Sequence, residues 1–227
     1  MSLAMLATPV YIICSPSPQV GKTLIARLLS EFLLLKDGAA LSFDINVREP
    51  SLCDYLPDIT ERACVGDTYG KMQLMDRLVL DDGVAKVIDL GFHVFDEFFK
   101  MCYQIGFVEE AVRSHVAPFI LFVAGADRVS LRSYASLRWQ MPRSALITIQ
   151  NEFVLRHELP GAVDHARALR LCVLPAFLRT YVDRPAFSFT GYLRSENDSS
   201  SELHQWIRRN YMALRELELS VMLQRSS

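Results

Sequence analysis

Three consecutive residues, Gly21-Lys22-Thr23, carry the clearest chemical signal in the sequence. This order ends a Walker A phosphate-binding loop, in which the lysine reaches the β- and γ-phosphates and the threonine hydroxyl contacts Mg²⁺. The glycine that such a loop has five residues before Gly21 is replaced by Pro16, and a second proline, Pro18, follows. The spacing therefore predicts a modified phosphate-binding loop.

The two prolines lie in the half of the loop that leaves the preceding strand. Proline has no N–H group and fixes φ, so each one stiffens the loop and removes a donor. The amides that a phosphate needs belong to the start of the following helix, where unpaired N–H groups attract anions. None of those residues is proline. The predicted nucleotide-binding residues of the loop are therefore Gln19, Val20, Gly21, Lys22, Thr23 and Leu24.

Two acidic residues end apolar strand-like segments. Asp89 closes VAKVID, as a Walker B aspartate does when it holds Mg²⁺ through water, and Asp44 closes LSFD. Thr23 and Asp89 are the predicted metal-binding residues, and Asp44 is placed where a second acid could face the same metal. Either acid alone is more typical of a strand-end cap, but the three features occur in the order that a nucleotide site requires.

The elements around these residues alternate between strand and helix. Short β-rich apolar runs predict strands at 9–14, 40–45, 84–90, 118–124, 144–149 and 168–174. Helical spacing of apolar residues predicts helices at 23–38, 95–115, 130–139 and 201–223. Nearly continuous apolar strands suit a sheet that is covered on both faces. We therefore expect a single nucleotide-binding domain over 1–227, an α/β protein with a mainly parallel sheet, helices on both faces and a three-layer P-loop NTPase fold.

Composition narrows the class of protein. The chain has 227 residues, of which 51% are hydrophobic and 22% charged, with a formal net charge of −2. This balance argues against a strongly basic nucleic-acid binder, and no apolar run reaches the ~18 residues of a membrane-spanning helix. The cysteines are odd in number and lack CxxC pairing, which favours reduced thiols and a cytoplasmic location over disulfides or a zinc site.

Several segments together resemble the MinD/ParA group of P-loop ATPases over nearly the whole chain. FDINVREPSLCDYL, VIDLG, FVAGADRVSLRSY, ITIQNEF and LCVLPAF are similar to successive motifs of that group. The resemblance implies ATP and Mg²⁺ as ligands, nucleotide-dependent homodimerisation, a possible partner protein and a role in partitioning or positioning. It also implies that Asn151 lies near the base, that the loop at Pro175 closes over the adenine, and that Lys22, Asp44, Asn46 and Asp89 serve catalysis.

The chain departs from the group at two positions. Ser17 replaces the signature lysine that reaches the phosphates of a partner subunit, and Asn46 replaces the second acid of an Asp-x-Asp pair. A carboxamide can orient a water molecule but cannot act as a base. Both changes predict that nucleotide binding persists while hydrolysis is weak or absent, so ATPase activity stays open.

Two alternatives stay open beside this hypothesis. One is a non-catalytic pseudo-ATPase that serves as an interaction module, and the other is an ATP-dependent ligase similar to dethiobiotin synthetase, which would need a second pocket beside the γ-phosphate. The absence of an NKxD motif favours ATP over GTP without deciding it. Arginines on the predicted helix 130–139 fit a solvated face, which leaves DNA binding open, and the acidic residues of the last helix favour packing over membrane attachment.

Overall fold

The protein is described by a computed structural model that covers residues 7–46, 51–142, 144–155, 160–164, 168–185, 187–195 and 199–225. Within these residues, seven strands form one sheet in which every pairing is parallel, in the order β3-β2-β4-β1-β5-β6-β7. The strands are β1 (Thr8–Cys14), β2 (Ala40–Ile45), β3 (Thr60–Arg62), β4 (Ala85–Leu90), β5 (Val116–Val123), β6 (Ala145–Asn151) and β7 (Ala168–Leu171).

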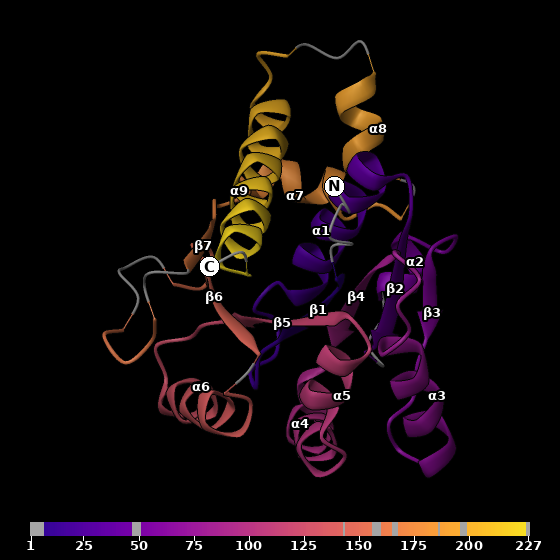
Figure 1. Ribbon diagram of the computed structural model, residues 1–227. Helices are drawn as coiled ribbons and strands as arrows, with labels where there is room; N and C mark the ends of the chain where they lie inside the picture. The colour runs from indigo at the N-terminus through magenta and orange to yellow at the C-terminus, as the bar shows by residue number, and fades with distance from the viewer. Residues whose placement is uncertain are drawn as a thin grey trace.

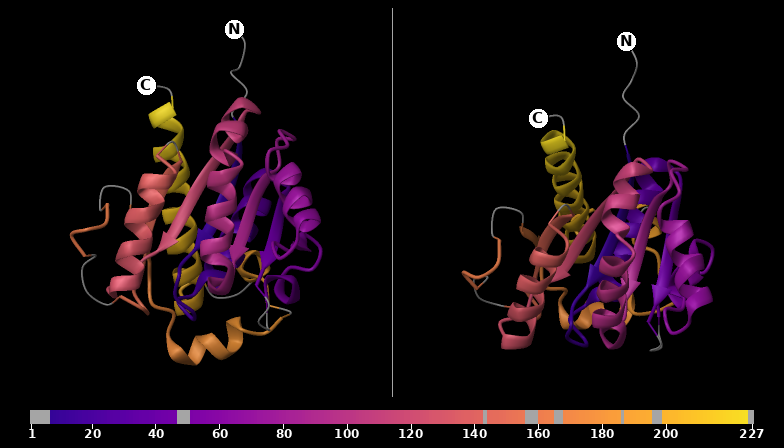
Figure 2. Two further views of the ribbon diagram at one scale, coloured as in Figure 1. Left: turned by 90° about the horizontal axis from the view of Figure 1, so that it is seen from below. Right: turned by 60° about the horizontal axis from the view of Figure 1, so that its bottom comes forward.

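Helices cover both faces of this sheet (Figure 1). On one side lie α1 (Lys22–Asp37), α7 (Ala176–Val182), α8 (Phe189–Arg194) and α9 (Glu202–Arg225), and on the other α3 (Thr68–Leu78), α4 (Phe95–Gln104), α5 (Phe107–Arg113) and α6 (Arg128–Gln140). The short helix α2 (Leu52–Tyr55) and the 3-10 turn η1 (Phe92–Val94) follow β2 and β4. Seen from the side of α3 to α6, the strands pass behind these helices and α9 lies beyond the sheet (Figure 2).

The core is divided by the sheet in the way that strand geometry requires. Successive side chains of a strand point to opposite faces, and on β1 Tyr11 and Ile13 join the apolar cluster beneath α1 and α9. Val10 and Ile12 join the cluster beneath α4 and α5. The predicted α/β fold, with a parallel sheet and helices on both faces, is therefore confirmed, and the last predicted helix is present as α9.

The structure corrects several predicted elements. The helix predicted at 95–115 is two helices, because Gly106 has a φ of 64° and turns the chain between α4 and α5. The strand predicted at 168–174 ends at Leu171, and the strand predicted from 118 already begins at Val116. Elements β3, α7 and α8 were not predicted, since each has at most seven residues and buries at most one side chain. Helix α3 was missed although its buried residues Leu74, Met75 and Leu78 have helical spacing.

Candidate functional site

The loop between β1 and α1 contains two residues with left-handed backbone conformations directly before a helix. Gln19 and Gly21 have positive φ values of 57° and 88°, and Gly21 is the residue from which α1 begins. Backbone N–H groups that converge in such turns form an anion-binding concavity, and the start of a helix adds the positive end of its dipole. The loop is therefore a candidate anion site.

Gly21 has no room for a side chain unless Asn151 moves. A Cβ atom built on it would lie 2.6 Å from Nδ2 of Asn151. That amide nitrogen donates a hydrogen bond of 2.9 Å to the carbonyl oxygen of Val20, and Oδ1 of Asn151 accepts one of 3.1 Å from the N–H of Phe153. Asn151 at the end of β6 thus fixes the loop, because it binds the loop backbone and its own strand end together.

Lys22 lies within this loop with its side chain almost covered. The residue is 7% exposed, and its Nζ donates a hydrogen bond of 3.0 Å to the carbonyl oxygen of Ser17. The same Nζ lies 5.9 Å from the ring centroid of Phe92, which follows β4. The ammonium group is therefore held at the mouth of the loop, at the end of the cavity that faces β4.

Thr23 connects the start of α1 to the end of β4. Its hydroxyl donates a hydrogen bond of 2.6 Å to Oδ2 of Asp89, a fully buried residue at 0% exposure. Oδ1 of Asp89 accepts no hydrogen bond from any residue that the structure describes. Burial, with a further contribution from Asp44, raises the pKa of Asp89 to about 6, against the opposing effects of Thr23 and Lys22.

Asp44 lies beside Asp89 on the neighbouring strand. The two residues are partners in the register of β2 and β4, so two carboxylates end adjacent parallel strands. The oxygens of Asp44 accept hydrogen bonds from the backbone N–H groups of Asn46 at 2.9 Å and Cys53 at 3.1 Å. Asp44 is thereby engaged in shaping the chain after β2, whereas Asp89 keeps one oxygen available.

The donor set beneath α1 fits a magnesium ion. Mg²⁺ prefers hard oxygen ligands and keeps several waters, so it needs only one or two protein oxygens beside the phosphates. The hydroxyl hydrogen of Thr23 goes to Asp89, which leaves the hydroxyl lone pairs for a cation. The unpartnered Oδ1 of Asp89 is a buried carboxylate oxygen at the same place. No cluster of three His, Cys, Asp or Glu side chains that could hold a metal occurs among the described residues.

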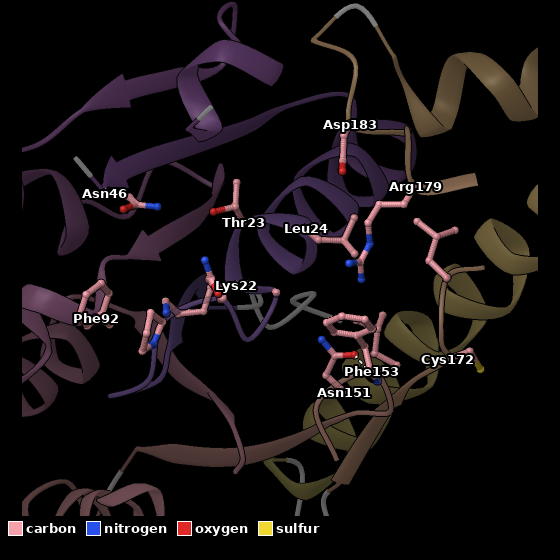
Figure 3. Close-up of a pocket in the computed structure, with 15 residues that line it drawn as sticks. Lys22, Thr23, Leu24, Asn46, Phe92, Asn151, Phe153, Cys172, Arg179 and Asp183 are labelled. Atoms are coloured by element: carbon pink, nitrogen blue, oxygen red, sulfur yellow. Dashed lines mark hydrogen bonds between the residues drawn. The ribbon is translucent and has the colours of Figure 1, made fainter. Parts of the chain in front are cut away.

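A cavity of about 310 Å³ opens in front of the loop (Figure 3). Lys22, Thr23, Asn46 and Phe92 lie towards one end of it, and Asn151, Phe153, Arg179 and Asp183 lie towards the other. The guanidinium carbon of Arg179 lies 4.0 Å from the ring centroid of Phe153. The described lining residues are Pro18, Gln19, Gly21, Lys22, Thr23, Leu24, Asn46, Phe92, Asn151, Phe153, Leu171, Cys172, Leu174, Arg179 and Asp183. Each end therefore combines a cation with an aromatic ring, Lys22 with Phe92 at one end and Arg179 with Phe153 at the other.

Some of the predicted site residues line this cavity and others lie outside it. Five of the six predicted loop residues line it, together with Asn46 and Asn151. Val20 instead packs its side chain into the core. Asp89 lies beneath Thr23, and Asp44 lines a neighbouring cavity. Pro175 is the N-cap of α7 and is not among the described lining residues.

Four polar or aromatic lining residues were not predicted. Phe92 and Phe153 follow Asp89 and Asn151 by three and two residues, so the strand ends that carried the prediction also carry these rings. Arg179 and Asp183 come from α7 and the residue after it, an element without a clear periodic signal. An inspection of aromatic residues next to predicted strand-end ligands could have found the first pair.

Comparisons with known proteins give no family assignment. No protein-family model matches the chain, and no curated protein matches it. No helix in the described ranges is long and apolar enough to cross a membrane.

Solved structures of similar shape do exist. A chain of the MinC:MinD cell division protein complex of Aquifex aeolicus is 17% identical, with 92% of this chain and 96% of that chain covered and a TM-score of 0.48. The MinD cell division protein of the same organism is 17% identical over 92% and 98% of the two chains, with a TM-score of 0.46. Chloroplast FtsY of Physcomitrella patens is 13% identical over 63% and 50%, with a TM-score of 0.42. These values do not transfer a function.

Proposed function

We propose that the chain is a nucleotide-binding protein that holds ATP with Mg²⁺ in the cavity at the start of α1. The observation that carries this proposal is the pair formed by Thr23 and Asp89, joined at 2.6 Å beneath a loop that also holds Lys22. A hydroxyl with free lone pairs and a buried carboxylate oxygen without a described partner make an oxygen site next to the loop whose amides we propose to bind phosphate. Magnesium bound to a polyphosphate needs both.

Each residue of the loop has a distinct part in this proposal. The amides of residues 19–24 would donate to phosphate oxygens. Lys22 would exchange its hydrogen bond to the carbonyl of Ser17 for one to the β- and γ-phosphates. Thr23 and Asp89 would hold Mg²⁺, which would neutralise phosphate charge when bound. Because Lys22 is already held within the loop, only its head group has to turn.

The opposite end of the cavity offers a place for the base. Phe153 presents a ring there, with the guanidinium of Arg179 against it. Aromatic rings and guanidinium planes both stack on nucleobases. Both hydrogen-bonding ends of the Asn151 carboxamide already bind backbone groups, so its main contribution is to fix the loop.

We propose that hydrolysis is slow because Asn46 is the side chain that faces the cavity after β2. Its carboxamide can orient water but cannot accept a proton. Asn46→Asp should therefore raise the rate of ADP formation, measured under single-turnover conditions with ATP and Mg²⁺. The matched control is Gln104→Glu, which also replaces a carboxamide by a carboxylate, at an exposed position on α4. An unchanged or lower rate in Asn46→Asp would contradict this explanation for slow hydrolysis.

We further propose that ATP binding controls association with a second copy or a partner protein, as the resemblance implies. Ser17 in place of the signature lysine removes the expected contact across a dimer, so association should be weaker than that lysine would allow. Light scattering after size-exclusion chromatography measures the mass of the assembly with ATP, with ADP and without nucleotide. An identical mass in all three conditions would contradict nucleotide-controlled self-association.

A titration with a fluorescent ATP analogue and Mg²⁺ tests the binding proposal itself. Lys22→Ala should weaken binding at least tenfold, because a charge-assisted contact to phosphate is worth about 1.5–3 kcal/mol. Lys100→Ala removes an exposed lysine on α4 and is the matched control, with no change expected. Binding that is equally strong in Lys22→Ala and in the wild type would refute the assignment of the loop. Binding without turnover would favour the pseudo-ATPase alternative.

A further inference from the structure

A second cavity adjoins the proposed nucleotide cavity. It measures about 410 Å³ and lies at the carboxyl ends of β2, β3 and β4. Its described lining residues are Asp44, Ile45, Asn46, Ser51, Arg62, Ala63, Cys64, Val65, Gly66, His93 and Val94. Asn46 lines both cavities. We use the name acceptor cavity for this second space.

The turn after β4 separates the two cavities. Phe92 lines the nucleotide cavity, and the next residue, His93, lines the acceptor cavity. Gly91 before them has no room for a side chain, because a Cβ atom would lie 2.4 Å from Cε1 of His93 and 2.7 Å from the carbonyl oxygen of Ile45. The imidazole of His93 is therefore folded back over Gly91.

The acceptor cavity is lined by hydrogen-bond donors and one permanent positive charge. Arg62 supplies a guanidinium, His93 an imidazole, Ser51 a hydroxyl and Asn46 a carboxamide. The only carboxylate among its described lining residues is Asp44, which is 3% exposed and accepts two backbone hydrogen bonds. The negative charge is thus turned into the protein and satisfied there. What the cavity offers to a ligand is donors and positive charge, which complement a carboxylate.

The size of the acceptor cavity limits the occupant. Small-molecule sites range from about 300 to 1,000 Å³, so this space accepts a molecule rather than a single ion. A guanidinium binds a carboxylate through two parallel hydrogen bonds and prefers it to neutral amides. We propose that the acceptor cavity binds a small molecule with a free carboxylate, anchored at Arg62 and extending to Asn46, next to the terminal phosphate of the nucleotide.

The position beside the terminal phosphate rests on the proposed function, whereas the carboxylate site itself does not. Ligand-detected NMR titration with glutarate, a five-carbon dicarboxylate, measures the site directly. Glutaramide has the same skeleton without the charges, and an acetylated tripeptide with a free C-terminus represents a carboxylate from a protein. Glutarate should bind saturably, and the other two should bind at least tenfold more weakly.

Arg62→Gln provides the test of the anchor. This variant should bind glutarate at least tenfold more weakly. The control is Arg113→Gln, which removes one positive charge at an exposed position on α5 and should bind glutarate as the wild type does. Thermal melting of each variant checks that the fold is kept. Equal glutarate affinity in Arg62→Gln and in the wild type, no saturable binding to the wild type, or equal binding of glutaramide would each overturn the proposal.

Cys64 gives an independent readout of the same cavity. It is exposed and lines the acceptor cavity, so bound glutarate should slow its alkylation by iodoacetamide at least threefold, as measured by mass spectrometry. Unchanged alkylation at saturating glutarate would overturn the location. ATP affinity is measured on the same wild-type sample. Glutarate binding without ATP binding would reject the proposed function and keep the carboxylate site, and the reverse result would reject the carboxylate site alone.

Discussion

Replacing Gly21 by alanine tests how the loop is held in place. The residue has a φ of 88°, a conformation that costs an L-residue about 1–2 kcal/mol. The new Cβ would also lie 2.6 Å from Nδ2 of Asn151, so that amide has to move away from the carbonyl of Val20. Loss of this buried hydrogen bond adds about 1–3 kcal/mol.

The two contributions predict that Gly21→Ala lowers the free energy of unfolding by roughly 2–5 kcal/mol. For a domain of this size each kcal/mol lowers Tm by about 2–4 °C, so Tm should fall by roughly 4–20 °C. Urea denaturation without nucleotide provides the measurement. The matched control is Gly38→Ala, because Gly38 has a φ of 76° and no heavy atom within 4 Å of an added Cβ. Gly38→Ala should therefore show the backbone cost alone.

A double-mutant cycle with Asn151→Ala isolates the contact. Asn151→Ala removes the amide that the new methyl group would meet, so the double variant should be more stable than the sum of the single effects predicts, by about 1–3 kcal/mol. Two results would refute the reasoning. One is additivity of the two variants to within about 0.5 kcal/mol, and the other is an equal loss of stability in Gly21→Ala and Gly38→Ala.

Three further predictions concern the neighbourhood of the site. Burial raises the pKa of Asp89 to about 6, so the folded protein binds this proton more tightly than the unfolded chain does. Without Mg²⁺, the free energy of unfolding should therefore fall by up to about 3 kcal/mol as pH rises from about 4 through 6. Urea titrations at the two ends of this pH range measure the loss, and Asp89→Asn should remove it. Arg27→Met should lower the free energy of unfolding, measured by urea denaturation, by about 1–3 kcal/mol for each of the carbonyls of Val182 and Phe187 that loses its donor. Gly91→Ala should weaken binding of the ATP analogue, since the new methyl group would meet the carbonyl oxygen of Ile45 at 2.7 Å, and an unchanged dissociation constant would contradict this.

The sequence allowed the arrangement of the loop half of the candidate site to be predicted, because its residues follow one another or end recognisable strands. The helix α1 spans Lys22–Asp37 with Gly38 as its C-cap, close to the bounds that the motif and the glycine indicated. Asp44 and Asp89 lie in register on adjacent strands, as their positions at the ends of apolar runs implied. Local signals were sufficient here, since the loop, the helix start and the strand ends are set by nearby residues.

The opposite half of the site could not be predicted, because it is built by tertiary contacts. Only Val182 of α7 is buried, so this helix lacks an apolar period that would reveal it. Arg27 on α1 had the charge of a solvent-facing residue, yet it is 2% exposed. Its guanidinium donates to the carbonyl oxygens of Val182 and Phe187 and lies 3.8 Å from the ring centroid of Tyr55. A buried arginine that ties distant segments together is visible only once the chain is folded.

The most direct measurement is a calorimetric titration of ATP into the wild type and into Thr23→Val, each with and without Mg²⁺. The replacement keeps the shape of the side chain and removes the hydroxyl that binds Asp89. We expect one ATP per wild-type chain and at least tenfold tighter binding with Mg²⁺, and we expect Thr23→Val to lose that Mg²⁺ effect. No saturable ATP binding to the wild type, or the same Mg²⁺ effect in Thr23→Val, would contradict the proposed nucleotide and magnesium site.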